Sequence, residues 1–265
     1  MRSAHPSCSG PLDLDGCRAL ADVLGDRPET VIAVQVLEHG LCKAYVPGTP
    51  SPFTGAIVQT ATLPGEPVGF GADPQVLWEL LKMIEGWRCV LVDAGCASGL
   101  GNLIEKECGS PVRYVDDVYH TVTAPVPTFR DNAVRLLTEA DAGLLQTIPL
   151  EFRAGFWGGT QALLAEGIVA GAVIAGEAVA TALTAARSRR CADIAVYTRE
   201  EFRNRGLATA AAALVARCVQ QAGQTPVWST GEHNIASLRV ARKLRFVEVS
   251  RRTYVVPQNR LQARQ

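Results

Sequence analysis

The sequence predicts an α/β protein with a mixed central sheet and helices packed on it. Apolar residues switch repeatedly between the alternating period of strands and the longer period of helices, which is typical of this class. The chain has 265 residues, of which 48% are hydrophobic and 20% charged, so it is able to bury a core. This length is comfortable for two domains, and we expect two packed halves.

A proline-containing stretch separates the halves. The segment Thr121–Asn132 contains Pro125 and Pro127 and has little helical or strand pattern, so we place the linker there. The predicted domains are residues 1–125 and residues 132–257, and residues 258–265 form a polar tail.

The first half is predicted to contain a helix, a strand, a helix and a strand. Their ranges are 75–84, 89–93, 101–108 and 112–122. A shift of about 136 positions places the last three on a strand, a helix and a strand of the second half, which is a shared order of elements with low residue identity. The first half has no Arg-x-x-Gly-x-Ala sequence, so we expect it to bind no cofactor.

The second half begins with a strand at 133–137 and a helix that Thr138 caps, followed by a loop at Gly155–Gly159. Apolar runs at 161–165, 169–175 and 178–185 are separated by turn residues and predict an antiparallel meander. The remaining predicted elements are a strand at 193–196, a helix from Gly206 to Gly223, a strand at 226–229, a helix from Asn234 and a strand at 247–256.

The most informative segment is the basic turn between the strand at 193–196 and the helix from Gly206. The first N–H groups of a helix have no backbone partner and carry partial positive charge. Gly206 lacks a Cβ and Ala208 is small, so a phosphate can approach closely, while Arg203 and Arg205 add full charges. The segment predicts a diphosphate-binding site, although solvated arginines on an ordinary turn would have the same sequence.

Composition excludes several function classes. Lysine plus arginine equals aspartate plus glutamate at 26 each, which argues against a general nucleic-acid binder. The cysteines and histidines lack metal-ligand spacing, so no metal is expected. The first ten residues do not resemble a secretory signal, and the apolar stretch 167–176 is too short to span a bilayer. We therefore expect a cytoplasmic protein without a membrane partner.

Three stretches in this order resemble the GNAT acyltransferase superfamily. They are Val134–Asp141, the turn Arg203–Ala208 and Asn234–Phe246, and together the resemblance covers about residues 132–257. It implies a GNAT fold with a mixed sheet in the second half, preceded by a degenerate GNAT-like first half. It also implies an N-acetyltransferase that uses acetyl-CoA as its acyl donor.

The resemblance implies the cofactor-binding residues. Backbone groups of Val196 and Thr198 would pair with the pantetheine arm, and the Val196 N–H would polarise the thioester carbonyl. Asn234 would reach the pantetheine. The diphosphate would be held by Arg203, Asn204, Arg205, Gly206, Leu207, Ala208 and Thr209.

The catalytic residues are less determined. Many members of the family have a tyrosine as general acid at the position of Ala241. In the present sequence the role passes to another group, to water or to none, and the nearby candidate groups are Ser237, Ser229 and His233. Asp193 occupies a place where many members hold a carboxylate, which makes it a candidate general base. Glu177 and Glu166, near the turns of the predicted meander, are alternative bases.

The acceptor is indicated only weakly. Phe156 and Trp157 lie between glycines in a loop where the family builds its acceptor site, and they either stack on a substrate ring or anchor the loop in the core. The two-part organisation resembles the group with zwittermicin-type and kasugamycin-type aminoglycoside acetyltransferases. Such a cationic acceptor would be attracted by carboxylates, for which the candidates are Asp116, Asp117, Glu151 and Glu177.

Three alternatives stay open. Glycines at 95, 99 and 101 after the strand at 89–93 weakly indicate an S-adenosylmethionine or nucleotide loop. A non-catalytic acyl-CoA sensor and an acetyltransferase of a protein or metabolite amine are also compatible with the sequence. The expected partner is a small-molecule amine, with a homodimer as an open possibility.

Overall fold

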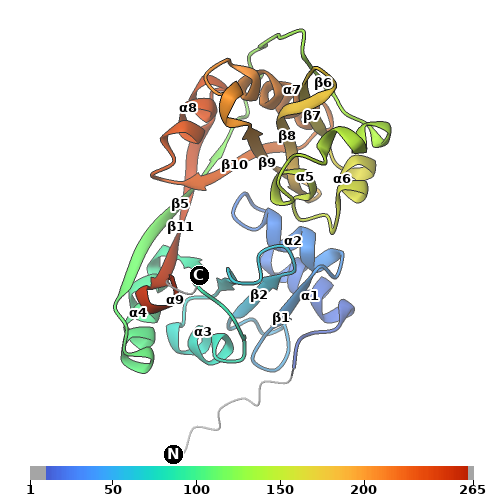
Figure 1. Cartoon of the computed structure of the whole chain (residues 1–265). Coiled ribbons are helices and arrows are strands. Elements are labelled where there is room, and N and C mark those ends of the chain that lie inside the picture. Colours follow the sequence, from blue (N-terminus) through green and yellow to red (C-terminus); the bar gives the residue numbers. More distant parts are fainter. Residues whose placement is uncertain (1–9, 262–265) are drawn as a thin grey trace, which may run out of the picture. The chain divides into compact units, whose positions relative to one another are not determined.

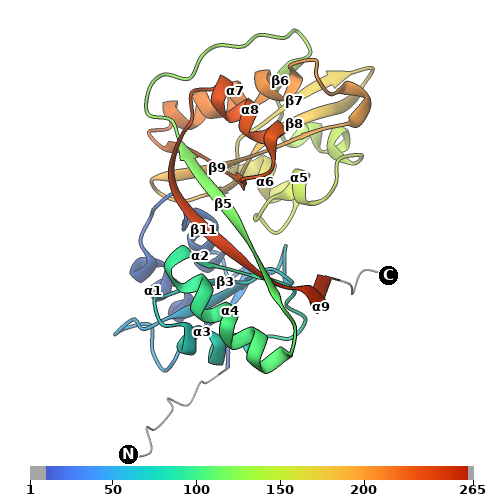
Figure 2. The same cartoon turned by 90° about the vertical axis from the view of Figure 1, so that its left-hand side faces the viewer.

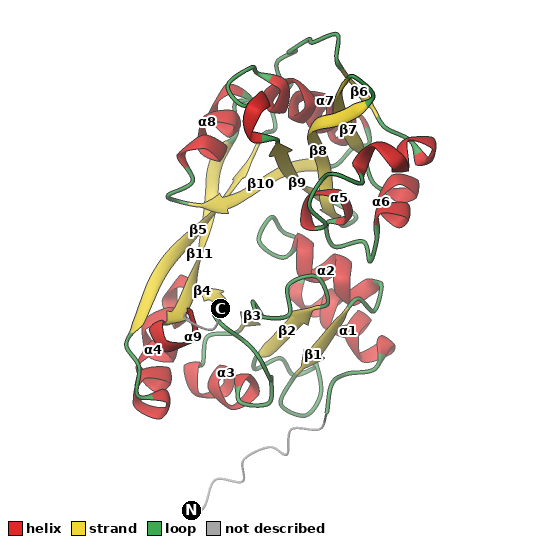
Figure 3. Ribbon diagram, in the orientation of Figure 1, coloured by secondary structure: helices red, strands yellow, loops and turns green. Residues whose placement is uncertain are grey.

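The computed structural model describes residues 10–261, without the side chains of residues 151 and 261. The chain contains both helices and strands (Figure 3). The described residues form two compact units. The first contains the chain up to Gly25, Val36–Asp117 and the chain from Arg251 onward, and the second contains Asp26–Gln35 and Val118–Ser250.

The first unit has a sheet in the order β1-β2-β3-β4-β11. Strands β1 and β2, β2 and β3, and β4 and β11 are antiparallel, whereas β3 and β4 are parallel. A core of apolar side chains from α3, β4 and α4 includes Leu77, Val92 and Leu100. The elements are α1 (Leu14–Leu24), β1 (Cys42–Tyr45), β2 (Ala56–Thr60), β3 (Val68–Phe70), α3 (Pro74–Leu81), β4 (Val90–Asp93), α4 (Ala94–Cys108) and α9 (Gln258–Leu261).

Three elements belong partly to each unit, because their residues lie on both sides of a boundary. They are α2 (Val31–Glu38), β5 (Val112–Thr121) and β11 (Val247–Pro257). Strands β5 and β11 are neighbours in the sheet, and Figure 2 shows both as long, strongly twisted strands.

The second unit has strands in the order β5-β10-β9-β8-β7-β6 (Figure 1). Strand β9 is parallel to β10 and antiparallel to β8. The strands are β6 (Val134–Leu136), β7 (Val169–Ile174), β8 (Glu177–Arg187), β9 (Cys191–Thr198) and β10 (Thr225–Gly231). The helices are η1 (Glu139–Leu145), α5 (Glu151–Ala154), α6 (Thr160–Glu166), η2 (Glu200–Phe202), α7 (Leu207–Gln221) and α8 (Ile235–Lys243).

Helix α7 packs on one face of this sheet through small side chains. Ala211, Ala212 and Ala213 are fully buried and contact a cluster that contains Ala170 and Ala182 of the strands. Alanine favours the helical conformation, and small residues on both surfaces allow the helix backbone to lie close to the sheet. Because side chains alternate along a strand, Ile194 and Val196 of β9 face α7.

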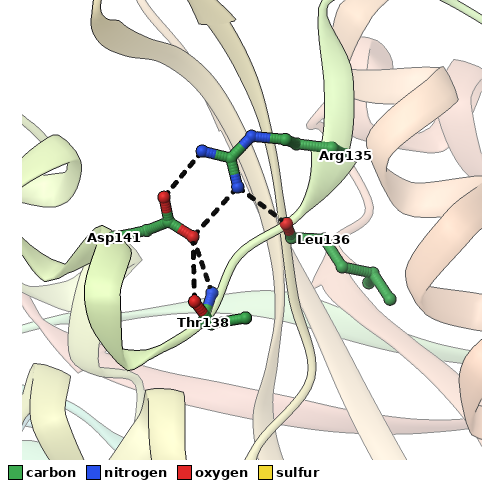
Figure 4. Close-up of polar contacts among 4 residues, drawn as sticks. All are labelled: Arg135, Leu136, Thr138 and Asp141. Carbon is green, nitrogen blue, oxygen red and sulfur yellow. Dashed lines mark hydrogen bonds and ion pairs between the residues drawn. The ribbon is translucent and has the colours of Figure 1, made fainter.

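The opposite face carries η1, α5 and α6. Ala195 and Tyr197 of β9 pack there with Leu145 and Leu163, and the Tyr197 ring lies 5.3 Å from that of Phe152 between centroids. The start of η1 is fixed by Asp141, whose carboxylate accepts hydrogen bonds from the Thr138 backbone N–H and from Arg135 (Figure 4). Thr138 is thus the predicted N-cap, although the element that follows is a 3₁₀-helix.

Most predicted elements of the second half are confirmed, with one error. Residues 161–165 were expected to form a strand of the meander, but they lie in α6, whose Leu163 and Leu164 are buried against η1 and the sheet. Strand β6 takes the place beside β7 instead.

The predicted domain limits, 1–125 and 132–257, remain a prediction. A single boundary does not describe the packing, because residues 252–255 of β11 pair with β4 in the first unit. Residues 26–35 likewise pack with the second unit.

Candidate active site

The beginning of α7 is open. Gly206 is its N-cap with φ 82°, and no side chain of the described residues caps the helix. A Cβ built on Gly206 would meet no atom within 4 Å, so the space beside the first turn is free. The unpaired N–H groups and the helix dipole therefore face a region into which an anion fits.

Two arginines are held near this helix start by one aromatic ring. The guanidinium carbons of Arg199 and Arg205 lie 5.5 and 5.3 Å from the centroid of the Phe202 ring, which is cation–π geometry. The Nε of Arg203 donates to the Thr198 carbonyl at 3.5 Å. The charges of Arg203 and Arg205 reinforce the anion-binding character of the turn, whereas Arg199 is paired with Glu177 and Glu201.

Helix α3 of the first unit lies between the parallel strands β3 and β4, as α7 lies between the parallel strands β9 and β10, and its start is closed. Asp73 is the N-cap of α3, and its carboxylate accepts hydrogen bonds from the N–H groups of Gln75 at 2.8 Å and Val76 at 3.5 Å. Pro74 occupies the first turn and has no N–H group. The carboxylate repels a phosphate and already uses the donors that a phosphate would need, so the start of α3 does not suit a diphosphate.

Strands β9 and β10 separate next to the open helix start. Their ladder covers residues 191–193 of β9 and 225–227 of β10, ending at the pair Val227 and Asp193. Strand β9 continues to Thr198 and β10 to Gly231, and β9 stays paired to β8 throughout. We call this divergence of the two parallel strands the fork. Val196 and Thr198 lie on the β9 edge of the fork, where an extended ligand is able to add to the strand.

Asp193 lies at the base of the fork. It is only 4% exposed, and its Oδ1 accepts a hydrogen bond from the Ser229 hydroxyl at 3.0 Å. The alternative base Glu177 is exposed at the start of β8, and its carboxylate is bound by Arg199 at 2.6 Å. Of the two, Asp193 is the carboxylate that the fold brings to the fork.

The start of α8 contains Asn234 and Ser237. Asn234 is the N-cap, and its Oδ1 accepts the Ser237 backbone N–H at 3.1 Å. The Ser237 hydroxyl oxygen accepts a hydrogen bond from Trp228 Nε1 at 2.9 Å. Ala241, where many members have tyrosine, is 1% exposed and packs in the cluster beneath α7, so its methyl group fills core space.

The predicted acceptor residues have different environments. Trp157 is 8% exposed and its Nε1 donates to the Thr184 carbonyl at 2.7 Å, which favours the interpretation as a loop anchor over stacking on a substrate. Phe156 is half-buried and packs against the same cluster of side chains as Trp157. Glu151 begins α5, but its side chain lies outside the described part of the structure.

A cavity of about 410 Å³ lies on the second unit near the end of β9. Its walls carry the carboxylates of Glu177, Glu200 and Glu201 and one cation, Arg199. Arg199 binds both Glu177 and Glu201. The remaining lining residues are Thr147 and Tyr197. Acidic groups therefore outnumber basic ones in this cavity.

Sequence reasoning did not single out Tyr197, Phe202 or Glu201. The alternation along β9 would have placed Tyr197 on the same face as Asp193, and the aromatic residue between two arginines is visible in the sequence. The pairing of Glu201 with Arg199 depends on the turn geometry and has no sequence signal.

The described residues contain no group of three histidine, cysteine, aspartate or glutamate side chains arranged for a metal ion. Burial raises the pKa of the Cys191 thiol to about 12 and that of Cys96 to about 11. These thiols are therefore protonated near neutral pH and are weak nucleophiles. Among residues 10–261, no helix is long and apolar enough to cross a membrane.

Comparison with known proteins places this geometry in context. The family model described as GNAT acetyltransferase matches residues 97–255. No curated protein matches the sequence.

Several solved structures share the fold. A GCN5-related N-acetyltransferase-like protein from Streptococcus suis is 22% identical, with a TM-score of 0.67. The match covers 92% of this chain and 99% of the Streptococcus suis protein. A putative GNAT acetyltransferase from Novosphingobium aromaticivorans is 17% identical over 87% of this chain and 97% of its own, with a TM-score of 0.56. A tandem GNAT protein from the clavulanic acid biosynthesis pathway is 14% identical, with a TM-score of 0.54. The match covers 93% of this chain and 96% of that protein.

Proposed function

The chain belongs to the GNAT acetyltransferase family and is an N-acetyltransferase, and from this premise we propose that it uses acetyl-CoA bound at the start of α7. The observation that carries the proposal is the uncapped helix start at Gly206, with open space beside it and with Arg203 and Arg205 in the turn that precedes it. This helix start follows β9, the strand whose pairing with β10 ends at Asp193.

Each part of this site suits one part of the donor. The N–H groups at 207–209 and the arginines would hold the diphosphate, and backbone groups of Val196 and Thr198 would pair with the pantetheine arm. When bound, acetyl-CoA supplies an activated thioester. The Val196 N–H, on the β9 edge, would polarise the carbonyl of that thioester.

The chemistry we propose is direct transfer to an amine. Asp193 would accept the proton that the amine loses, and Ser237 would donate one to the leaving thiolate. The buried thiols of Cys191 and Cys96 do not suit a covalent route, because their raised pKa values keep them protonated.

We further propose that the acceptor is the primary amine of a small cationic molecule, with a kasugamycin-type aminoglycoside as the first candidate. The acidic cavity supports this, because Glu177, Glu200 and Glu201 outnumber Arg199 and would attract positive charge. The amine of a protein or another metabolite is the alternative acceptor. An aminoglycoside panel that also contains spermidine and a peptide amine distinguishes these classes.

The decisive experiment measures acetyl-CoA affinity by calorimetry in Arg203→Glu. The reversed charge at the helix start should weaken binding by about 10-fold to 100-fold, in keeping with a charged hydrogen bond. Arg113→Glu is the matched control, since Arg113 is an exposed residue of β5 in the first unit. Equal affinity of wild type and Arg203→Glu would refute the proposed site. A second assay measures the release of free coenzyme A thiol from acetyl-CoA with and without an amine. An enzyme releases thiol only when the amine is present, whereas a non-catalytic sensor releases none.

A further inference from the structure

We infer that Ser229 is a proton relay between the acceptor amine and Asp193. The inference rests on the proposed function, in which Asp193 is the general base. Ser229 lies on β10 two residues beyond Val227, the last residue paired with β9. Its side chain reaches back to Asp193, with 3.0 Å between the Ser229 Oγ and the Asp193 Oδ1.

Burial explains why a relay is needed. Asp193 is 4% exposed, whereas Ser229 is half-buried on the edge of the fork. Of the two groups, the Ser229 hydroxyl is therefore the more accessible to a substrate amine. A general base must be within hydrogen-bond distance of the proton that it takes. A buried carboxylate meets this condition through a hydrogen-bonded neighbour that the substrate is able to contact.

The two candidate proton-handling groups lie on opposite faces of the sheet. Val227 packs with Cys191, which places Ser229 and Asp193 on the face away from α7. Trp228 packs in the cluster beneath α7 and donates to Ser237. Ser229 is therefore separated from Ser237, so the proton that the amine loses is taken up on one face and the proton that the thiolate gains is supplied from the other.

The proton transfer balances without a further reactant. An N–H proton of the attacking amine moves to the Ser229 Oγ as the new N–C bond forms. The original hydroxyl proton of Ser229 moves at the same time to the Asp193 Oδ1. The thioester C–S bond then breaks, and the leaving thiolate takes the hydroxyl proton of Ser237, which solvent replaces. Ser229 ends as a hydroxyl, Asp193 ends protonated, and solvent takes the proton from Asp193 before the next turnover.

The same hydrogen bond stabilises the charged form of Asp193. A carboxylate that loses a donor in a buried site binds a proton more readily. Removal of the hydroxyl should therefore move the acidic limb of the rate profile to higher pH, besides slowing proton transfer at every pH.

The test compares Ser229→Thr with Ser229→Val. The two variants have nearly the same shape and both suit a strand, but only threonine keeps the hydroxyl. Spermidine and kasugamycin are the acceptor probes, with acetyl-CoA as donor. We expect Ser229→Val to lower kcat by about 10-fold to 100-fold, a part of the usual effect of general base catalysis, with little change in the acetyl-CoA KM. Ser229→Thr should retain most of kcat.

Ser250→Ala is the matched control, because it removes a similar serine–carboxylate hydrogen bond, to Glu29 at 3.2 Å, on β11. A second measurement needs no acceptor. With ¹³C-labelled aspartate, the Asp193 carboxyl signal, assigned by its loss in Asp193→Asn, should titrate at higher pH in Ser229→Val than in Ser229→Thr.

The outcomes separate the relay from the proposed base. Equal kcat and equal titration of the threonine and valine variants would overturn the relay and leave Asp193 as base. Wild-type kcat in Asp193→Asn would overturn the base itself. The relay and the base are both supported if kcat falls in Ser229→Val but not in Ser229→Thr, and if the Asp193 carboxyl titrates at higher pH in Ser229→Val.

Discussion

Single side chains determine where the irregular segments of this chain begin, and Asp141 is the clearest example. Its two carboxylate oxygens accept hydrogen bonds from Arg135 at 2.6 and 2.9 Å and from the backbone and hydroxyl of Thr138 (Figure 4). The Arg135 guanidinium and the Thr138 N–H hold the pKa of the Asp141 carboxyl well below its usual range. A 3₁₀-helix of seven residues is thereby attached to the end of β6.

Replacement of Asp141 by alanine should destabilise the protein by about 1 kcal/mol, the usual effect of losing an N-terminal cap. Because the folded pKa is depressed, the contribution of Asp141 is present above its unfolded pKa near 4 and is lost as the pH falls below it. Urea unfolding at pH 7 and pH 3 measures both effects. Glu139→Ala, at an exposed neighbour in the same helix, should change stability less, and a constant difference between wild type and Asp141→Ala over this pH range would contradict the assignment.

At the scale of elements, the two ends of α7 offer a controlled comparison. Gly206 precedes the helix with φ 82° and Gly223 follows it with φ 76°, and a Cβ at either position meets no atom within 4 Å. Alanine costs about 1 kcal/mol in such a left-handed conformation, so both Gly206→Ala and Gly223→Ala should lower stability by a similar amount. Thermal unfolding without ligand measures this shared effect.

Only Gly206→Ala should also weaken acetyl-CoA binding, because its methyl group would occupy the space beside the first N–H groups of α7. We expect a loss of about 10-fold, measured by calorimetry at a temperature where both variants are folded. Equal affinities of the two variants would show that the diphosphate lies elsewhere.

The elements also show how far the sequence predicts the fold. Helix α7 and strands β9 and β10 were predicted because their apolar residues repeat with an unmixed period. The run 161–165 was misassigned, since a short apolar segment has no decisive period and its helical state depends on packing against η1. The turn Arg203–Ala208 was predicted from its residues together with the strand before it and the helix after it. The fork was not visible, because the end of a ladder depends on the partner strand.

At the scale of the whole molecule, the half-buried Cys42 and Cys89 and the buried Cys191 report on each unit separately. Desolvation raises the pKa of Cys89 and Cys42 in the first unit to about 12, as it does for Cys191 in the second. Their thiolate fractions are small at pH 8, so alkylation of the folded protein should be slow.

Iodoacetamide labelling at increasing urea, read by peptide mass spectrometry, should therefore show when each unit opens. If the units unfold together, Cys89 and Cys191 become reactive at the same urea concentration. Different midpoints would show independent unfolding. Fast labelling of Cys191 without urea would contradict its burial.

The pairing of β4 with β11 has a consequence for biosynthesis. Residue 93 has residue 252 as its register partner, and residues 118–250, the larger part of the second unit, are encoded between them. During translation the second unit is able to fold on the ribosome while one edge of β4 still waits for its neighbour. An unsatisfied strand edge of this kind is a template for aggregation, so a nascent chain stalled before residue 252 should recruit chaperones that a full-length chain releases.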